Sequence, residues 1–205
     1  MMLKDLRPSL ALLLILTLVT GFAYPLLLTV AGHALFPYQA NGSLIERNGR
    51  VIGSALIGQS FADPAYVWGR PSATTMPDPA DESKTVAAPY NAANSGASNL
   101  APSAKAFIDA VNQQSDRLKA SDPDQTTPPP ADLVMASASG LDPDISPQAA
   151  MWQARRVAMA RHASLADVQA LIETLTEPRT LGILGEPHVN VLALNMALDA
   201  RWPKP

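Results

Sequence analysis

The side chains that most often carry chemistry are few in this chain and far apart in its sequence. Three histidines occur, His33, His162 and His188, and no spacing places two of them on one helical face. A zinc-type site would need them to converge from distant segments, and each is more simply a surface or loop residue. Because no cysteine is present, the chain has neither a disulfide framework nor a thiolate metal site. We therefore predict no metal site.

Two other arrangements bear on hydrolytic chemistry. Asp142 and Asp144 stand in a Leu-Asp-Pro-Asp-Ile turn, where a carboxylate pair can serve acid–base catalysis but where Asp beside Pro is also ordinary turn chemistry. A Ser-His-Asp constellation remains open, although no Gly-x-Ser-x-Gly elbow is present, and no glycine spacing matches a phosphate-binding loop. These residues do not amount to an active site. We predict neither catalytic nor cofactor-binding residues, which is typical of one part of a larger assembly.

A long stretch without a periodic pattern, residues 69–101, offers a different kind of surface. In a chain of this size such a stretch is either disordered or tied down for a purpose, and its aromatic and Asn content favours the second. Its hydrogen-bonding groups suit contact with a partner protein. The predicted subunit-contact residues are Gln59, Arg70, Tyr90, Asn91, Ser95 and Asn99.

The element that must position all of these residues is an N-terminal apolar run. From Pro8 to Ile45 there is no Asp, Glu, Lys or Arg, and residues 10–28 are almost continuously apolar. A helix rising about 1.5 Å per residue needs roughly 20 such residues to cross a hydrocarbon core about 30 Å thick. The run therefore predicts a transmembrane helix over residues 9–36, with a kink at Pro25 near its far end.

The flanking charges predict the orientation of that helix. Lys4 and Arg7 precede it, and no Lys or Arg follows until Arg47. The positive-inside rule then places residues 1–8 in the cytoplasm and residues 37–205 outside it, as a periplasmic domain held at the inner (plasma) membrane.

A cleaved secretory signal is the alternative interpretation. Residues 10–20 would be its apolar region and Gly21-Phe22-Ala23 a small-x-small cleavage site. The apolar character continues well past Ala23, where a mature protein should become polar, so we favour the anchor. Both interpretations export the domain.

Length and charge limit what the exported part can be. The chain has 205 residues, so the part beyond the anchor is long enough for one domain with a genuine core and hardly for two. Of the net charge of −3, Lys4, Arg7 and Asp5 contribute +1, which leaves −4 beyond the first thirty residues. This balance disfavours nucleic acid or an anionic lipid surface as the main partner.

Local patterns predict an α+β fold, in which a single N-terminal transmembrane helix precedes one mixed α/β domain with a β-hairpin and about four helices. Asn48-Gly49 supplies the two positive-φ residues of a type I′ turn, so a hairpin is expected over residues 43–59. The aromatic residues that follow it, from Phe61 to Trp68, are expected to cover this hairpin. A helix is expected over residues 104–120, with Ser103 as its N-cap, and a second from Ser146-Pro147 to residue 162. A third helix, which begins with a capping box, is expected over residues 164–176, and a fourth over residues 189–198. Short strands are expected after Asp132 and over residues 181–185.

Motifs distributed along nearly the whole chain resemble those of one known family. They are Gly53 to Gln59, Phe61, Pro64, Tyr66, Gly69 to Ala73, Pro89 to Asn91, Ser95-Gly96, Ser98 to Leu100, Asp132 to Val134, Ser139 to Pro143, Ile145-Ser146, Gln153 to Arg161, Leu184 to Pro187, Val189 to Leu192, Asn195 and Leu198-Asp199. Together with the anchor, this pattern resembles the KdpC family, the C subunits of the bacterial Kdp potassium-transporting ATPases.

The resemblance implies a non-catalytic accessory subunit of a complex that imports potassium at the expense of ATP. In this family a channel-like A subunit carries the ion and a P-type ATPase B subunit hydrolyses ATP, and these two are the implied partners besides membrane lipid. The C subunit is needed for assembly and acts as a catalytic chaperone that raises the ATP affinity of the B subunit. ATP is cytoplasmic, whereas the predicted topology places everything after Phe36 outside, so we expect no direct ATP contact.

Some positions depart from the family pattern. Ala97 and Ala138 stand where Gly is expected, Asp144 stands where the family usually has His, and His188 where it often has Arg. Residues 95–99 also resemble, loosely, the Ser-Gly-Gly stretch of transporter nucleotide-binding domains. The alternative function is a free-standing, membrane-anchored periplasmic hydrolase or ligand-binding domain.

Overall fold

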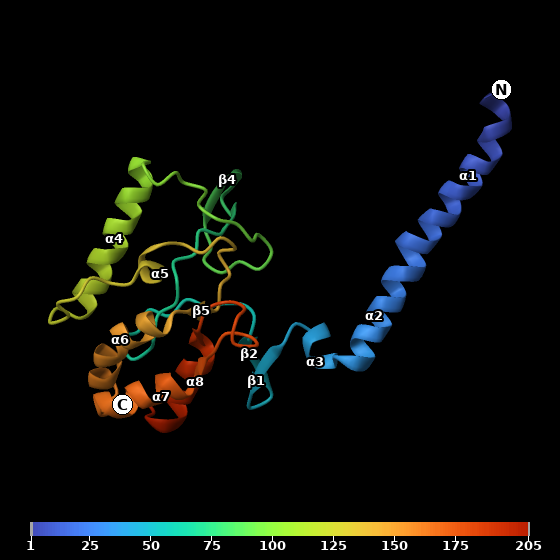
Figure 1. The fold of residues 1–205 in the computed structure, drawn as a ribbon. Helices are drawn as coiled ribbons and strands as arrows, with labels where there is room; N and C mark the ends of the chain where they lie inside the picture. Colours follow the sequence, from blue (N-terminus) through green and yellow to red (C-terminus); the bar gives the residue numbers. More distant parts are fainter. Residues whose placement is uncertain (1, 205) are drawn as a thin grey trace. The chain divides into compact units, whose positions relative to one another are not determined.

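The structure is a computed structural model that describes residues 2–204, with side chains described from residue 4 onward. The chain divides into two compact units, Met1–Ile52 and Gly53–Pro205, which are described separately below. Figure 1 shows the long helix of unit 1 and the mixed helices and short strands of unit 2.

A long apolar helix makes up most of unit 1. It consists of α1 (Met2–Leu18), one π-helical turn (Val19–Ala23) and α2 (Tyr24–Leu35). Within the described residues, Lys4–Leu35 is the one helix long and apolar enough to cross a membrane, and none of its side chains is buried. At about 1.5 Å per residue it exceeds the roughly 30 Å hydrocarbon thickness of a bilayer.

The π turn lies just before Pro25, where the sequence predicts a kink. Proline has no N–H for the carbonyl four residues earlier, and its ring clashes with that carbonyl. Here that carbonyl belongs to Gly21, which lies inside the π turn. Thr20 and Thr29 donate their hydroxyls to the carbonyls of Leu16 and Pro25, so these polar groups are satisfied within the helix.

The predicted β-hairpin is confirmed. After the short helix α3 (Pro37–Ala40), strands β1 (Leu44–Arg47) and β2 (Arg50–Ser54) pair with each other. Asn48 and Gly49 between them have φ angles of +54° and +71°, as a type I′ turn requires.

Unit 2 combines helices with two small antiparallel sheets, which confirms the predicted α+β class. One sheet is the hairpin β3–β4, and the other has the strand order β5–β7–β6. The elements are β3 (Thr75–Asp78), β4 (Asp81–Ala87), α4 (Lys105–Ser121), α5 (Ala131–Val134), β5 (Asp144–Ile145), α6 (Pro147–Ala160), α7 (Leu165–Thr174), β6 (Thr176–Glu177), β7 (His188–Asn190) and α8 (Val191–Arg201).

Helices α6, α7 and α8 provide most of the core of unit 2. Val157, Ile172 and Leu194, one from each helix, are completely buried. Trp68 from an irregular loop and Leu118 from the last turn of α4 join the same cluster. Segments far apart in the sequence therefore meet on the C-terminal helices.

Side-chain caps begin three of the four long helices in unit 2. The hydroxyl of Ser146 accepts from the N–H of Ala149 at the start of α6, and that of Ser164 accepts from Asp167 at the start of α7, as predicted. The sequence reasoning missed a third cap, in which the Asn190 side chain accepts from the N–H of Ala193 at the start of α8.

Four local predictions are wrong. Ser103 is not the N-cap of α4, because Ala104 holds that position without a side-chain hydrogen bond. The strand expected after Asp132 is the short helix α5, which buries Leu133 completely. Residues 69–101 are not wholly irregular, since they contain the β3–β4 hairpin. Residues 181–185 are not a strand but part of the loop between β6 and β7.

Candidate functional site

Two buried amide side chains hold the backbone of residues 67 and 68 on both sides. Asn195 of α8 accepts from the N–H of Val67 at 2.8 Å and donates to its carbonyl at 2.9 Å. Gln153 of α6 accepts from the N–H of Trp68 at 2.9 Å and donates to its carbonyl at 3.0 Å. We call this arrangement the amide clamp. It takes the place of a β-ladder for a segment that no strand pairs with in the described structure.

A buried arginine extends the amide clamp. Arg156 of α6 donates to the carbonyls of Pro64 and Tyr66 and to the side-chain oxygen of Gln153. Its guanidinium also lies 4.2 Å from the centre of the Trp68 ring, a cation–π contact. Burial lowers the pKa of Arg156 to about 10, against the opposing effect of nearby carboxylates, so the group is still cationic at neutral pH.

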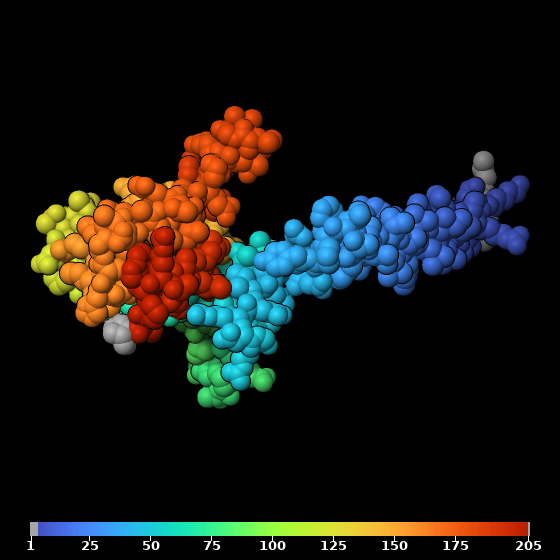
Figure 2. All heavy atoms as spheres, turned by 90° about the horizontal axis from the view of Figure 1, so that it is seen from below, coloured from blue at the N-terminus to red at the C-terminus, as the bar shows by residue number. Residues whose placement is uncertain are grey.

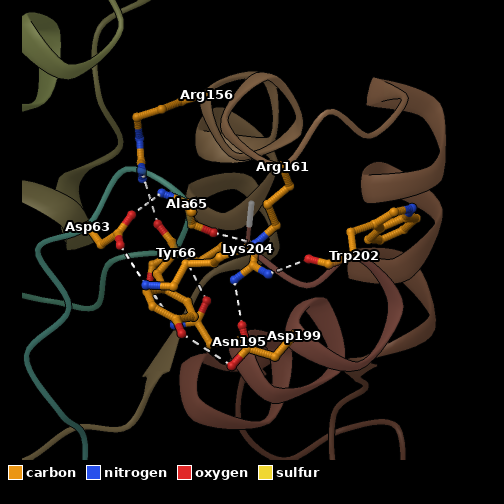
Figure 3. A network of polar contacts seen from close by, with 10 residues as sticks. Asp63, Ala65, Tyr66, Arg156, Arg161, Asn195, Asp199, Trp202 and Lys204 are labelled. Carbon is orange, nitrogen blue, oxygen red and sulfur yellow. Dashed lines mark hydrogen bonds and ion pairs between the residues drawn. The ribbon is translucent and has the colours of Figure 1, made fainter.

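A second arginine ties the start of the same loop to α8, as Figure 3 shows. Arg161 donates to the carbonyls of Ala65 and Trp202 and pairs with the carboxylate of Asp199 at 2.9 Å. The hydroxyl of Tyr66 donates to the other oxygen of Asp199 at 3.2 Å. The aromatic residues expected to cover the hairpin thus pack against α6 and α8 within unit 2.

An ion pair closes this network at its exposed edge. Lys204 donates to Asp63 at 2.7 Å and lies over the Tyr66 ring, 4.8 Å from its centre. The hydrogen bond from Lys204 is the main reason that the pKa of Asp63 lies below its usual value, assisted by the backbone N–H of Ala65. All these polar groups stabilise the fold of the chain itself.

A cleft of about 240 Å³ with a mixed polar and apolar lining lies beside the clamped loop. Its lining includes three of the predicted contact residues, Gln59, Arg70 and Tyr90, together with Trp68 and Arg117. The guanidinium of Arg117, on α4, lies 4.9 Å from the centre of the Trp68 ring. The structure therefore brings these three predicted residues together around one small opening.

Tyr90 and Asn91 bond within the chain. The Tyr90 hydroxyl donates to the carbonyl of Arg70 at 2.6 Å, and burial raises its pKa to about 12. The side chain of Asn91 donates to the carbonyl of Thr75 at 2.8 Å. Tyr90 holds the loop after β4 against the segment before β3, and Asn91 holds it against the first residue of β3, so both residues have a structural role.

The last two predicted contact residues lie farther along the same loop. Ser95 donates its hydroxyl to the carbonyl of Ser139 at 2.9 Å. Asn99 is exposed, has a φ of +51° and donates to the carbonyl of Ala97. Ala97 and Ala138, which replace expected glycines, are not among the positive-φ residues, so a side chain fits there without backbone strain.

A second, charged cleft of about 440 Å³ separates β5 from the loop that follows β6. Arg70 pairs with Asp142 in its wall at 3.0 Å. His188 lies between two carboxylates, 3.9 Å from Asp144 and 3.7 Å from Glu177. Burial is the main cause that raises the pKa of Asp144 above its usual value, with His188 opposing it.

Two departures from the family pattern, Asp144 and His188, are therefore neighbours. An acid stands where the family pattern suggested a histidine, and a histidine stands where it suggested an arginine, so both changes make this cleft less positive. Among the described residues no cluster of three or more His, Asp or Glu side chains is arranged to hold a metal ion.

The loop between β6 and β7 exposes aliphatic side chains. Residues 178–187, which we call the tip loop, are all exposed, and Leu181 is 85% and Ile183 74% accessible. It forms the orange lobe that stands out from unit 2 in Figure 2. The sequence reasoning missed this surface because an apolar Leu-Gly-Ile-Leu-Gly run looks like a short buried strand.

Comparisons with known proteins identify the family. The profile described as "KdpC: K+-transporting ATPase, c chain" matches residues 6–200. A Potassium-transporting ATPase KdpC subunit from Bradyrhizobium diazoefficiens is 58% identical over 198 residues, covering 97% of this chain and 98% of the relative. A protein of the same name from Rhodopseudomonas palustris strain BisB18 is 59% identical, covering 97% of this chain and 99% of the relative. Another from Methylobacterium nodulans is 56% identical, covering 97% of this chain and 98% of the relative. The chain therefore belongs to the KdpC family, the C chains of potassium-transporting ATPases.

Proposed function

We propose that this chain is the non-catalytic accessory subunit of an ATP-driven, high-affinity potassium importer. The observation that carries the proposal is the family match from residue 6 to residue 200, which includes both the apolar helix and unit 2. In the proposed arrangement the helix Lys4–Leu35 anchors the subunit in the plasma membrane and unit 2 lies on the extracytoplasmic side.

The geometry of unit 2 supports an assembly role. The amide clamp and the buried arginines Arg156 and Arg161 bond to backbone carbonyls and N–H groups of the chain. In this role unit 2 is a rigid body that presents a surface to the channel-like A subunit and the ATP-hydrolysing B subunit.

An effect on ATP affinity would then be indirect. With unit 2 outside the cytoplasm, ATP and unit 2 are on opposite sides of the membrane, so the chain would favour the ATP-binding state of the B subunit through subunit packing. A coupling free energy of about 1–3 kcal/mol, equivalent to roughly 5–150-fold in affinity, is the usual size of such an effect.

The test is co-expression of the full chain with the A and B subunits. We expect the chain to co-purify with both in detergent, and its deletion to abolish stable assembly and potassium-stimulated ATPase activity. Protease should reach unit 2 in spheroplasts and not in inverted vesicles. A chain that elutes alone while the A and B subunits retain full activity would overturn the proposal and favour a free-standing domain.

A further inference from the structure

The tip loop is the most exposed apolar surface of unit 2. Its three large aliphatic side chains, Leu181, Ile183 and Leu184, are 85%, 74% and 57% exposed. From residue 180 to residue 185 no side chain is charged. Contiguous exposed aliphatic groups usually mark a surface that another molecule covers.

The tip loop has a defined shape before any partner binds. Thr180 and Leu184 exchange two backbone hydrogen bonds, at 2.9 and 3.0 Å, across the tip. Leu181 has a φ of +54°, an unfavourable conformation for a leucine by about 1–2 kcal/mol. At the neck of the loop, Arg179 and Glu186 form an ion pair at 2.5 Å. Because the side chains are already presented, little conformational entropy is lost on docking.

The chemistry of the tip loop favours a protein partner over a lipid surface. Segments that insert into the membrane interface usually carry Trp or Tyr and unpaired Lys or Arg. Residues 178–187 contain no aromatic residue, and their one basic residue, Arg179, is paired with Glu186. Glu177 and Asp144 lie beside the base of the loop, so an anionic bilayer surface would repel this region.

We propose that the tip loop is a preformed apolar plug that docks into an apolar pocket on the extracytoplasmic surface of another subunit of the same potassium-transporting ATPase. The acidic surroundings of the loop fit a neutral or basic rim around that pocket. The proposal rests on the proposed function and adds to it the element that makes the contact, which is the tip loop rather than residues 69–101.

The test changes the surface of the loop without straining it. In Leu181→Asn/Ile183→Ser, the polar side chains remove the apolar tip, and Asn tolerates the positive φ at position 181 better than Leu does. The matched control is Met159→Gln, which changes a 56% exposed apolar side chain on α6. We expect the loop variant to keep the melting temperature of the full chain and to bind the complex of the other subunits at least tenfold more weakly, whereas the control binds like wild type.

The remaining outcomes separate the alternatives. A loop variant that binds like wild type overturns the plug, and a wild-type chain that does not bind the other subunits overturns the proposed function instead. Because the chain has no cysteine, Ile183→Cys accepts a single environment-sensitive fluorophore. A blue shift that appears only on adding the other subunits supports a protein pocket. A blue shift in vesicles of anionic phospholipid alone overturns it in favour of lipid.

Discussion

Replacing Asn195 by leucine should destabilise unit 2 by far more than one hydrogen bond is worth. The substitution removes the partners of both the N–H and the carbonyl of Val67, now at 2.8 and 2.9 Å. Val67 is completely buried, so water cannot replace them. Each unsatisfied buried polar group costs about 1–3 kcal/mol, which gives about 2–6 kcal/mol in total. That is a large fraction of the 5–15 kcal/mol by which typical domains are stable.

Urea denaturation of the full chain in detergent micelles measures this loss. All three tryptophans lie in unit 2, and the backbone of Trp68 is itself held by the amide clamp, so intrinsic fluorescence reports the relevant transition. The matched control is Asn94→Leu, which removes an exposed amide bonded to Thr75 and should cost less than about 1 kcal/mol.

A double variant sharpens the test. Gln153→Leu should be nearly as harmful as Asn195→Leu, and the two together should cost less than the sum, because both release the same two-residue segment. If Asn195→Leu loses less than about 1 kcal/mol, or no more than Asn94→Leu, the backbone of Val67 does not depend on the clamp and the reasoning is refuted.

Three further changes have expected results. Ser146→Ala removes the hydroxyl that accepts from Ala149 at 3.0 Å, and should lower the free energy of unfolding by about 1 kcal/mol in the same urea assay. Asp144 has a raised pKa in the folded chain, so its contribution to stability is fully present below the unfolded value of about 3.9 and is lost as the pH rises through the folded value. Asp144→Asn should therefore melt higher than wild type at pH 7, and melting curves below pH 4 should show the difference gone. The pKa of Tyr90 is raised to about 12, so wild type should lose stability from about pH 10 upward. Tyr90→Phe loses the hydrogen bond to the carbonyl of Arg70 and should be about 1 kcal/mol less stable than wild type at pH 7. Melting curves should show this difference in stability between variant and wild type becoming smaller between pH 10 and 12.

Local signals predicted those parts of the fold that are set by nearby residues. The apolar run predicted the helix Lys4–Leu35, Asn48-Gly49 predicted the type I′ hairpin, and Ser146-Pro147 predicted the start of α6. Each depends on a few consecutive side chains and on backbone geometry that those side chains favour.

The failures arise where distant partners decide the structure. The segment 131–134 became a helix because that conformation places Leu133 in the core. The segment 181–185 has the composition of a buried strand, but the short strands β6 and β7 pair below it and leave it outside. No local pattern distinguishes an apolar segment that the core covers from one that is left exposed.

The candidate contact residues also have long-range bonds that local patterns do not indicate. Polar loop composition predicts that Tyr90 and Asn91 face a partner, which stays a prediction; within the chain, both bond to carbonyls 16 to 20 residues earlier. Gln59, Arg70 and Tyr90 line one cleft, although their contact with another subunit stays a prediction. Sequence reasoning did not find the amide clamp, because Gln153 and Asn195 act on residues 85 and 128 positions away.

The π turn at Val19–Ala23 makes the membrane helix unequally sensitive to changes in length. A π turn contains one residue more than an α turn, so deleting one residue there would restore a regular helix and leave the two flanks facing the same neighbours as before. The same deletion inside α1 would rotate everything that precedes it by about 100° relative to the remainder, moving a different set of side chains toward any adjoining helix. The extra residue of the π turn is thus a position at which the membrane helix can be shortened by one residue without rotating one of its flanks relative to the other.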